Sequence, residues 1–102
     1  MLAQQYARQY KQQEILSASP EELVLTLYDL GLQACARRDR DRLRLVLREL
    51  INSLNFDYEE VARTFFELYM YCLHQTHNGH FEAVREVLAE LRQQWKNHVL
   101  KR

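Results

Sequence analysis

Apolar residues recur every three or four positions through four stretches of this chain, which predicts four amphipathic helices. The links between the stretches are short, so consecutive helices must run antiparallel. The pattern therefore predicts an all-α fold, an antiparallel up-down four-helix bundle with an N-terminal extension. The expected buried faces, one helix after another, are Leu23, Val24, Leu27, Tyr28, Leu30, Gly31, Ala34 and Cys35; Leu43, Val46, Leu47, Leu50 and Leu54; Val61, Ala62, Phe65, Tyr69, Cys72 and Leu73; and Phe81, Val84, Val87, Leu88, Leu91, Trp95 and Val99.

The first helix has a strong start signal. Ser19 suits the N-cap position, where its hydroxyl accepts a bond from an otherwise unpaired backbone N–H. Pro20 follows at the first helical position, where its missing N–H costs nothing. Glu22, three residues after Ser19, completes a capping box and places a carboxylate at the positive end of the helix dipole. The helix is expected to run from Pro20 to about Arg37.

Polar residues also mark the later helix boundaries. Asp39 or Asp41 can cap the second helix, which is expected to stop near residues 52–55. Asp57 with Glu60 three positions on predicts a capping box at the start of the third helix. Gly79 is expected to end that helix, because glycine adopts the left-handed C′ conformation without a Cβ clash.

The segment before the bundle differs from the rest. Residues 1–16 are rich in Gln and Tyr and lack the apolar run of a signal peptide. Their apolar residues, Tyr10 and Ile15 among them, are too sparse for a core helix. We expect a segment that lies over the bundle or is mobile, and a bundle formed by residues 17–102.

Composition narrows the class of protein. A chain of 102 residues is one domain, and its two glycines and one proline are too few for an all-β fold. Fourteen basic and fourteen acidic residues cancel, leaving no global field to attract nucleic acid or an anionic membrane. No apolar run has the length of a membrane span. Cys35 and Cys72 fall on helical apolar faces rather than in a disulfide framework, so a cytoplasmic location is the simplest expectation.

Candidate chemistry is sparse. Cys72, His74, His77 and His80 are metal-ligand types at close spacing, but Cys72 is expected to face the core and His80 to lie beyond the helix. The arginine-rich stretch 37–44 contains two aspartates and no aromatic residues, which favours a solvated, self-paired turn over RNA binding. No glycine-rich phosphate loop or nucleophile with a nearby base is present. The sequence indicates a non-enzymatic protein with no metal and no cofactor.

One string carries more information than a helix start. Residues 17–29 read S-A-S-P-E-E-L-V-L-T-L-Y-D, which resembles the signature of the flagellin-specific export chaperones, the FliS family. The resemblance continues in order through the tyrosine segment 10–18, L-I-N-S-L-N at 50–55, L-Y-M-Y at 68–71 and L-x-x-L-x-x-x-W at 88–95. It covers about residues 10 to 96.

The resemblance implies a function. Members of that family bind the C-terminal segment of flagellin in the cytoplasm, prevent its premature polymerisation and keep it competent for flagellar type III secretion. By this resemblance, the partner would be the flagellin segment or a related filament subunit, and the flagellar export apparatus would be a second partner. Such a client wraps a rigid bundle and folds on binding.

A wrapped bundle needs apolar side chains outside its core face. Leu25 and Leu32 lie about 160° round the first helix from Leu23 and Leu30, on a face expected to be wet. Leu45, Ile51, Leu68 and Tyr71 are off the core stripe in the same way. We therefore predict as partner-binding residues Leu25, Tyr28, Leu32, Leu68 and Tyr71, together with Tyr10 and Ile15, which could cover the same grooves when no client is bound.

The chain also departs from the family. It is shorter by roughly four turns of helix between Asp29 and Leu50 and by about two between Tyr71 and Trp95. The usual Gly-Gly between the second and third helices is replaced by residues 56–58. The missing turns favour an alternative more than they would in a full-length relative: a related helical-bundle regulator or adaptor that binds a different partner or forms a homodimer. An isolated apolar surface residue is also the ordinary condition of a soluble protein.

Overall fold

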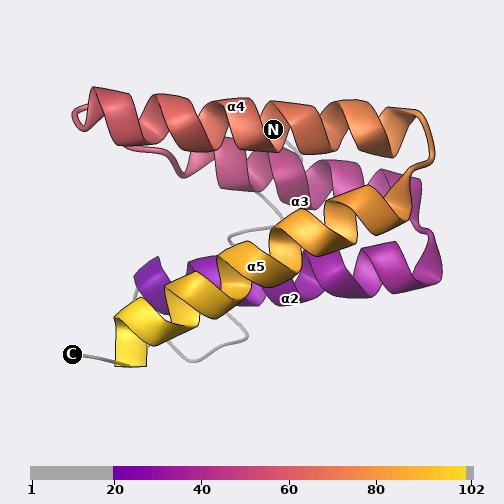
Figure 1. Cartoon of the computed structure of the whole chain (residues 1–102), viewed down its shortest axis with the longest axis horizontal. Helices are drawn as coiled ribbons and strands as arrows, with labels where there is room; N and C mark the ends of the chain where they lie inside the picture. The colour runs from indigo at the N-terminus through magenta and orange to yellow at the C-terminus, as the bar shows by residue number, and fades with distance from the viewer. Residues whose placement is uncertain (1–19, 101–102) are drawn as a thin grey trace.

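The computed structural model describes residues 20–100, which form four α-helices and no strand within that range. The helices are α2 (Pro20–Arg37), α3 (Arg40–Asn52), α4 (Glu59–His77) and α5 (Phe81–Leu100). Each helix packs against its neighbours along the chain, and α5 closes the ring by packing against α2 (Figure 1). The predicted antiparallel four-helix bundle is confirmed.

All four helices contribute to one core. Tyr28 of α2, Leu43 and Leu47 of α3, and Leu88 of α5 are among its largest fully buried side chains. The α2–α5 interface is the most extensive of the four and the α4–α5 interface the least. The helices are therefore not packed symmetrically around the core, and this asymmetry shapes the candidate site.

The turn between α2 and α3 is tight. Arg38 adopts a left-handed conformation, with φ of 53°. The Arg38 N–H donates to the Cys35 carbonyl at 3.1 Å and the Asp39 N–H to the Ala34 carbonyl at 2.9 Å, which is the Schellman pattern of a helix C-terminus. The Asp39 carboxylate then accepts from the Arg42 N–H at 3.1 Å. Of the two predicted caps, Asp39 is the one that starts α3.

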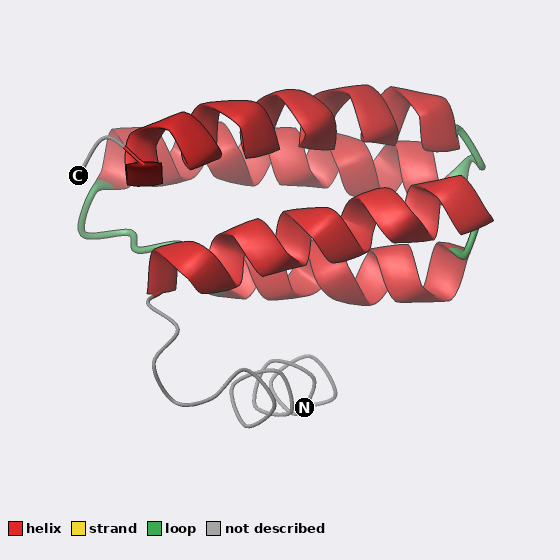
Figure 2. Ribbon diagram, turned by 90° about the horizontal axis from the view of Figure 1, so that it is seen from below, coloured by secondary structure: helices red, strands yellow, loops and turns green. Residues whose placement is uncertain are grey.

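The turn between α4 and α5 has the same design. Gly79 has φ of 77°, its N–H donates to Thr76 at 3.0 Å, and the His80 N–H donates to Gln75 at 2.9 Å. The predicted role of Gly79 as the residue that ends the third helix is confirmed. Figure 2 shows these two short turns together at one end of the bundle, with the α3–α4 connection at the other end.

The α3–α4 connection, residues 53–58, is longer and differs from prediction. The expected capping box of Asp57 and Glu60 is wrong, since α4 begins at Glu59 and its N-cap, Tyr58, makes no side-chain capping bond. Instead, the Asp57 backbone N–H donates to the Asn55 Oδ1 at 2.9 Å. This local turn around Asn55 takes the place of a helix cap and leaves Asp57 outside α4.

Candidate partner-binding groove

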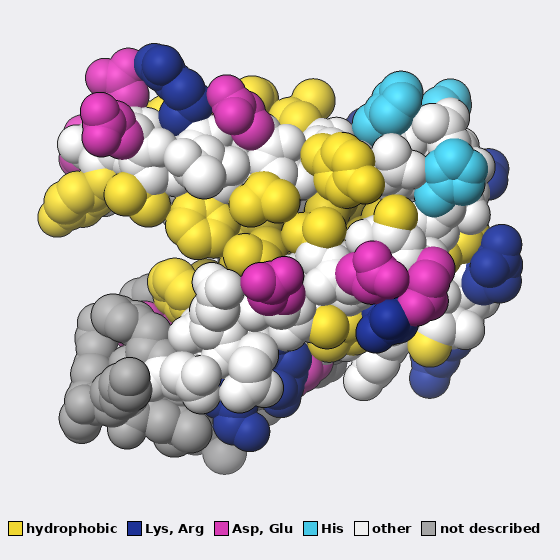
Figure 3. Space-filling view, in the orientation of Figure 1, with side chains coloured by type: hydrophobic (Ala, Val, Ile, Leu, Met, Phe, Trp, Pro, Cys, Tyr) yellow, Lys and Arg dark blue, Asp and Glu magenta, His cyan; other side chains and the backbone are white. Residues whose placement is uncertain are grey.

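The helices α4 and α5 leave an apolar groove at the end of the bundle opposite the Gly79 turn. They start close together at that turn and diverge (Figure 1), and the space-filling view shows a hollow flanked by hydrophobic side chains (Figure 3). Its volume is about 860 Å³. The lining residues are Glu21, Val24, Tyr28, Ser53, Leu54, Asn55, Tyr58, Val61, Ala62, Phe65, Tyr69 and Trp95. We call this set the open-end groove.

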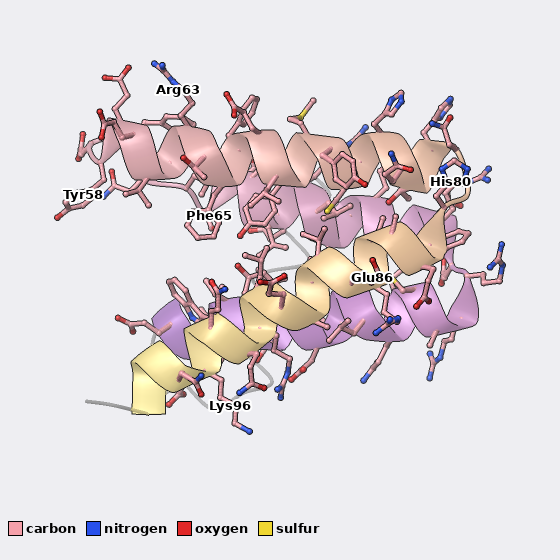
Figure 4. The ribbon with its side chains drawn as sticks, viewed as in Figure 1. Tyr58, Arg63, Phe65, His80, Glu86 and Lys96 are labelled. Atoms are coloured by element: carbon pink, nitrogen blue, oxygen red, sulfur yellow. The ribbon has the colours of Figure 1, made fainter. Side chains whose placement is uncertain are left out.

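The α4 wall of the open-end groove is strongly apolar and partly exposed. The Tyr58 and Val61 side chains are 71% and 59% exposed. Phe65 projects from α4 toward α5 (Figure 4), and its ring lies 6.0 Å from that of Tyr69. Apolar surface of this kind is stabilised by a partner that removes it from water.

The opposite wall is held in place by α2. The indole Nε1 of Trp95 donates to the Glu21 carbonyl oxygen at 2.9 Å, which ties the C-terminal half of α5 to the first turn of α2. One turn earlier in α5, the Arg92 guanidinium forms an ion pair with the Asp29 carboxylate of α2. Because α5 is fastened to α2 rather than to α4, the groove stays open on the α4 side.

The groove floor holds two phenols. The hydroxyl oxygens of Tyr28 and Tyr69 lie 2.8 Å apart and share a hydrogen bond. The two residues are only 1% and 3% exposed. Burial raises the pKa of both phenols, and for Tyr28 the hydrogen bond with Tyr69 acts in the opposite direction. Both hydroxyls therefore keep their protons at neutral pH.

Leu25 and Leu32 do not lie on a wet face. Asp29 shares their side of α2, four residues after Leu25 and three before Leu32, and its ion pair with Arg92 places that side against α5. Leu25 is half-buried, and Leu32 packs against the core. The predicted exposed stripe is wrong, because α2 is covered by α5 as well as by α3 and has a wider buried arc than one core stripe.

The other predicted partner-binding residues are dispersed. Tyr28 is buried and contributes to the floor of the open-end groove, so it is the one predicted partner-binding residue among the described ones that lines the groove. On α4, Leu68 is half-buried and Tyr71 is exposed, and neither lines the groove. Tyr10 and Ile15 fall outside the described residues. Whether any of these residues binds a partner remains a prediction.

Sequence reasoning missed the open-end groove because a groove wall has the same helical period as a core face. Val61, Phe65 and Trp95 were assigned to buried faces, yet Val61 is exposed and the other two are only partly buried. The signal that could have found them is the difference in link length. Residues 53–58 join α3 to α4 at the open end, whereas residues 38–39 suffice at the other end.

Two buried thiols, those of Cys35 and Cys72, lie outside the groove lining. Burial raises the pKa of the Cys35 thiol to about 11 and that of Cys72 to about 12, so both are protonated at neutral pH. Within residues 20–100, no three His, Cys, Asp or Glu side chains are placed to hold a metal ion. Two arginines of the stretch 37–44 have local partners. The Arg38 guanidinium stacks over the Phe81 ring, 4.9 Å from its centroid, and the Arg42 Nε lies 3.9 Å from the Asp39 carboxylate.

One buried carboxyl has no partner. Glu49 of α3 is mostly buried, and its Oε2 makes no hydrogen bond. Burial raises the pKa of this carboxyl above its usual value, because removal from water disfavours the charged form.

Comparisons of the chain with protein-family models, with curated proteins and with solved structures give no match in any of the three. None of the helices in the described part of the chain is long and apolar enough to cross a membrane.

Proposed function

We propose that this protein is a cytoplasmic export chaperone of the FliS type, a binding protein rather than an enzyme. Its client is the C-terminal segment of flagellin or of a related filament subunit. Binding keeps the segment from polymerising and leaves it competent for flagellar type III secretion. The single observation that carries the proposal is the open-end groove, an apolar surface that residues 20–100 leave uncovered in an otherwise well-packed bundle.

The shape and chemistry of the groove favour a helical client. Its long wall runs from Tyr58, the N-cap of α4, to Tyr69 within that helix, and its opposite wall includes Trp95 of α5. A groove between two helices accepts an amphipathic helix that inserts residues spaced three and four apart. Ordering such a segment costs about 2–5 kcal/mol, which burial of the groove wall offsets.

The sequence resemblance supplies the identity of the client. The P-E-E-L part of the string lies at the start of α2, whose first three turns contribute Glu21, Val24 and Tyr28 to the groove. The L-Y-M-Y segment at 68–71 contributes Tyr69. Parts of the two resembling motifs therefore meet at one groove, which is what a shared binding function requires.

Calorimetric titration with a flagellin C-terminal peptide tests the proposal. Wild-type protein should bind with a large negative heat-capacity change, because apolar surface is buried. Val61→Asp should weaken binding at least tenfold, since it places a charge on the groove wall. Met70→Asp is the matched control, because Met70 is also an exposed apolar residue of α4 but does not line the groove.

Equal affinities for Val61→Asp and wild type would contradict a role for the groove. Absence of binding by the wild-type protein would contradict flagellin as the client. A loss of affinity as large in Met70→Asp as in Val61→Asp would place the binding surface elsewhere on α4.

The alternative, a regulator or adaptor that self-associates, is favoured by a second surface. Phe56 and Phe66 are exposed and contact each other edge to face, with ring centroids 6.4 Å apart. Sedimentation equilibrium of wild type and Phe66→Asp decides this alternative. A dimer that Phe66→Asp dissociates supports it, and a monomeric wild type argues against it.

A further inference from the structure

The floor of the open-end groove contains one polar point, the hydroxyl pair of Tyr28 and Tyr69. The protein satisfies the hydrogen-bonding groups of this pair only in part. Tyr28 and Tyr69 bring two hydroxyl groups together beneath apolar lining residues such as Val24 and Phe65. A phenol hydroxyl offers one donor hydrogen and also accepts hydrogen bonds. The pair therefore contains two hydrogens to be placed.

One of these two hydrogens has no acceptor among the described residues. The bond between the hydroxyls uses a single hydrogen, and either oxygen can be the donor. Whichever donates, the hydrogen of the other phenol is left over. A buried donor without an acceptor is costly, and such groups in folded proteins usually have a partner.

Two polar side chains at the rim of the groove, Ser53 and Asn55, make local hydrogen bonds. Ser53 Oγ donates to the Leu50 carbonyl at 2.7 Å, and Asn55 Oδ1 accepts from the Asp57 N–H at 2.9 Å. These bonds hold both side chains in the α3–α4 connection. Neither of these side chains supplies the acceptor for the remaining phenol hydrogen, which leaves that hydrogen for a group that enters the groove.

We propose that the bound segment presents one side-chain carboxamide, from Gln or Asn, to the Tyr28–Tyr69 pair within an otherwise apolar helical stripe. This inference rests on the proposed function, in which the groove binds a helical segment. It assigns the pair a specificity role, namely fixing which turn of the segment lies over the groove floor.

A carboxamide matches the pair better than other polar groups. It accepts from the remaining phenol hydrogen and donates to a phenol oxygen, so both of its functions are used. A carboxylate would have to lose its hydration in an apolar groove, which is costlier. Tyr28 and Tyr69 are almost fully buried, so the group must be carried on a slender side chain.

The test uses two synthetic amphipathic helices that are identical except for a central Gln or Met in the apolar stripe. Wild-type protein should bind the Gln helix more tightly, relative to the Met helix, than the double variant Tyr28→Phe/Tyr69→Phe does. The double variant keeps both rings and removes both hydroxyls together, so we expect it to fold. The Gln-to-Met affinity ratio should fall on the order of fivefold between the two proteins.

An unchanged ratio would overturn the inference. Should the double variant fail to fold, the wild-type protein alone provides the test with helices in which Gln is moved along the apolar stripe. One position should then bind better than its neighbours, and equal weakening at every position would overturn the inference.

The flagellin peptide separates this inference from the proposed function. Failure of that peptide to bind, with the Gln preference intact, removes flagellin as client and supports the role of the pair. Tight flagellin binding without any Gln preference leaves the function and overturns the inference. A groove that binds no helix contradicts both.

Discussion

At one end of the bundle, Arg38 and Gly79 adopt left-handed conformations and close two turns of two and three residues, 38–39 and 78–80. At the other end, residues 53–58 form a longer connection, α4 has no side-chain cap, and α4 and α5 stand apart around the open-end groove. The helices are therefore closely packed at the turn end, whereas α4 and α5 are separated at the groove end.

This difference separates stability from binding. Tight turns and fully buried side chains such as Leu43 give the closed end its stability. The open end is left with apolar surface that a partner can bury, and Trp95 holds its α5 wall against α2. A rigid frame that carries an unfilled groove is a suitable scaffold for a segment that folds on binding.

Large-to-small substitutions should give the largest difference in free energy of unfolding between the two ends. Leu43→Ala near the closed end should lower the free energy of unfolding by about 2–5 kcal/mol, because Leu43 is fully buried. Val61→Ala in the groove wall should change it by less than about 0.5 kcal/mol. Urea denaturation measures both, and equal losses would contradict the division into a stabilising and a binding end.

An intermediate effect is expected at the turn between α4 and α5. Gly79→Ala should cost about 1–2 kcal/mol, because residue 79 has positive φ and an L-residue is strained there. Gly79→Asn should cost less, since Asn tolerates the left-handed conformation. Thermal unfolding of the two variants checks the order, and an Ala variant as stable as wild type would show that the turn is not essential.

The smallest effect concerns Glu49, which is buried without a partner on Oε2. Its pKa is raised in the folded state, so the folded protein binds its proton more tightly than the unfolded chain does. Its contribution is most favourable below the unfolded pKa and is lost as pH rises through the folded pKa. Glu49→Gln should therefore raise Tm at pH 7, and this gain should shrink toward pH 4. A gain that is constant with pH would contradict the assignment.

The sequence was sufficient to predict helix number, order and most boundaries. Helical period placed Leu43, Leu47 and Leu88 in the core, and Gly79 was correctly predicted to end the third helix. These features depend on local chemistry and on one buried face per helix. Both can be deduced from spacing alone.

The candidate site could not be predicted in the same way. Whether Val61 meets a core or a groove depends on how far α5 lies from α4, which no local pattern encodes. Leu32 was misjudged for the related reason that α2 has two neighbours and therefore a broad buried arc. The pairing of Tyr28 with Tyr69 spans two helices and follows only from the assembled bundle.

Trp95 offers the most direct measurement of the central claim, because it is the single tryptophan of the chain and lines the open-end groove. Titration with a flagellin C-terminal peptide that contains no tryptophan should shift the Trp95 emission to shorter wavelength, with saturation at the calorimetric stoichiometry. The groove would then be the binding site. Binding detected by calorimetry without any change in Trp95 emission would contradict the account.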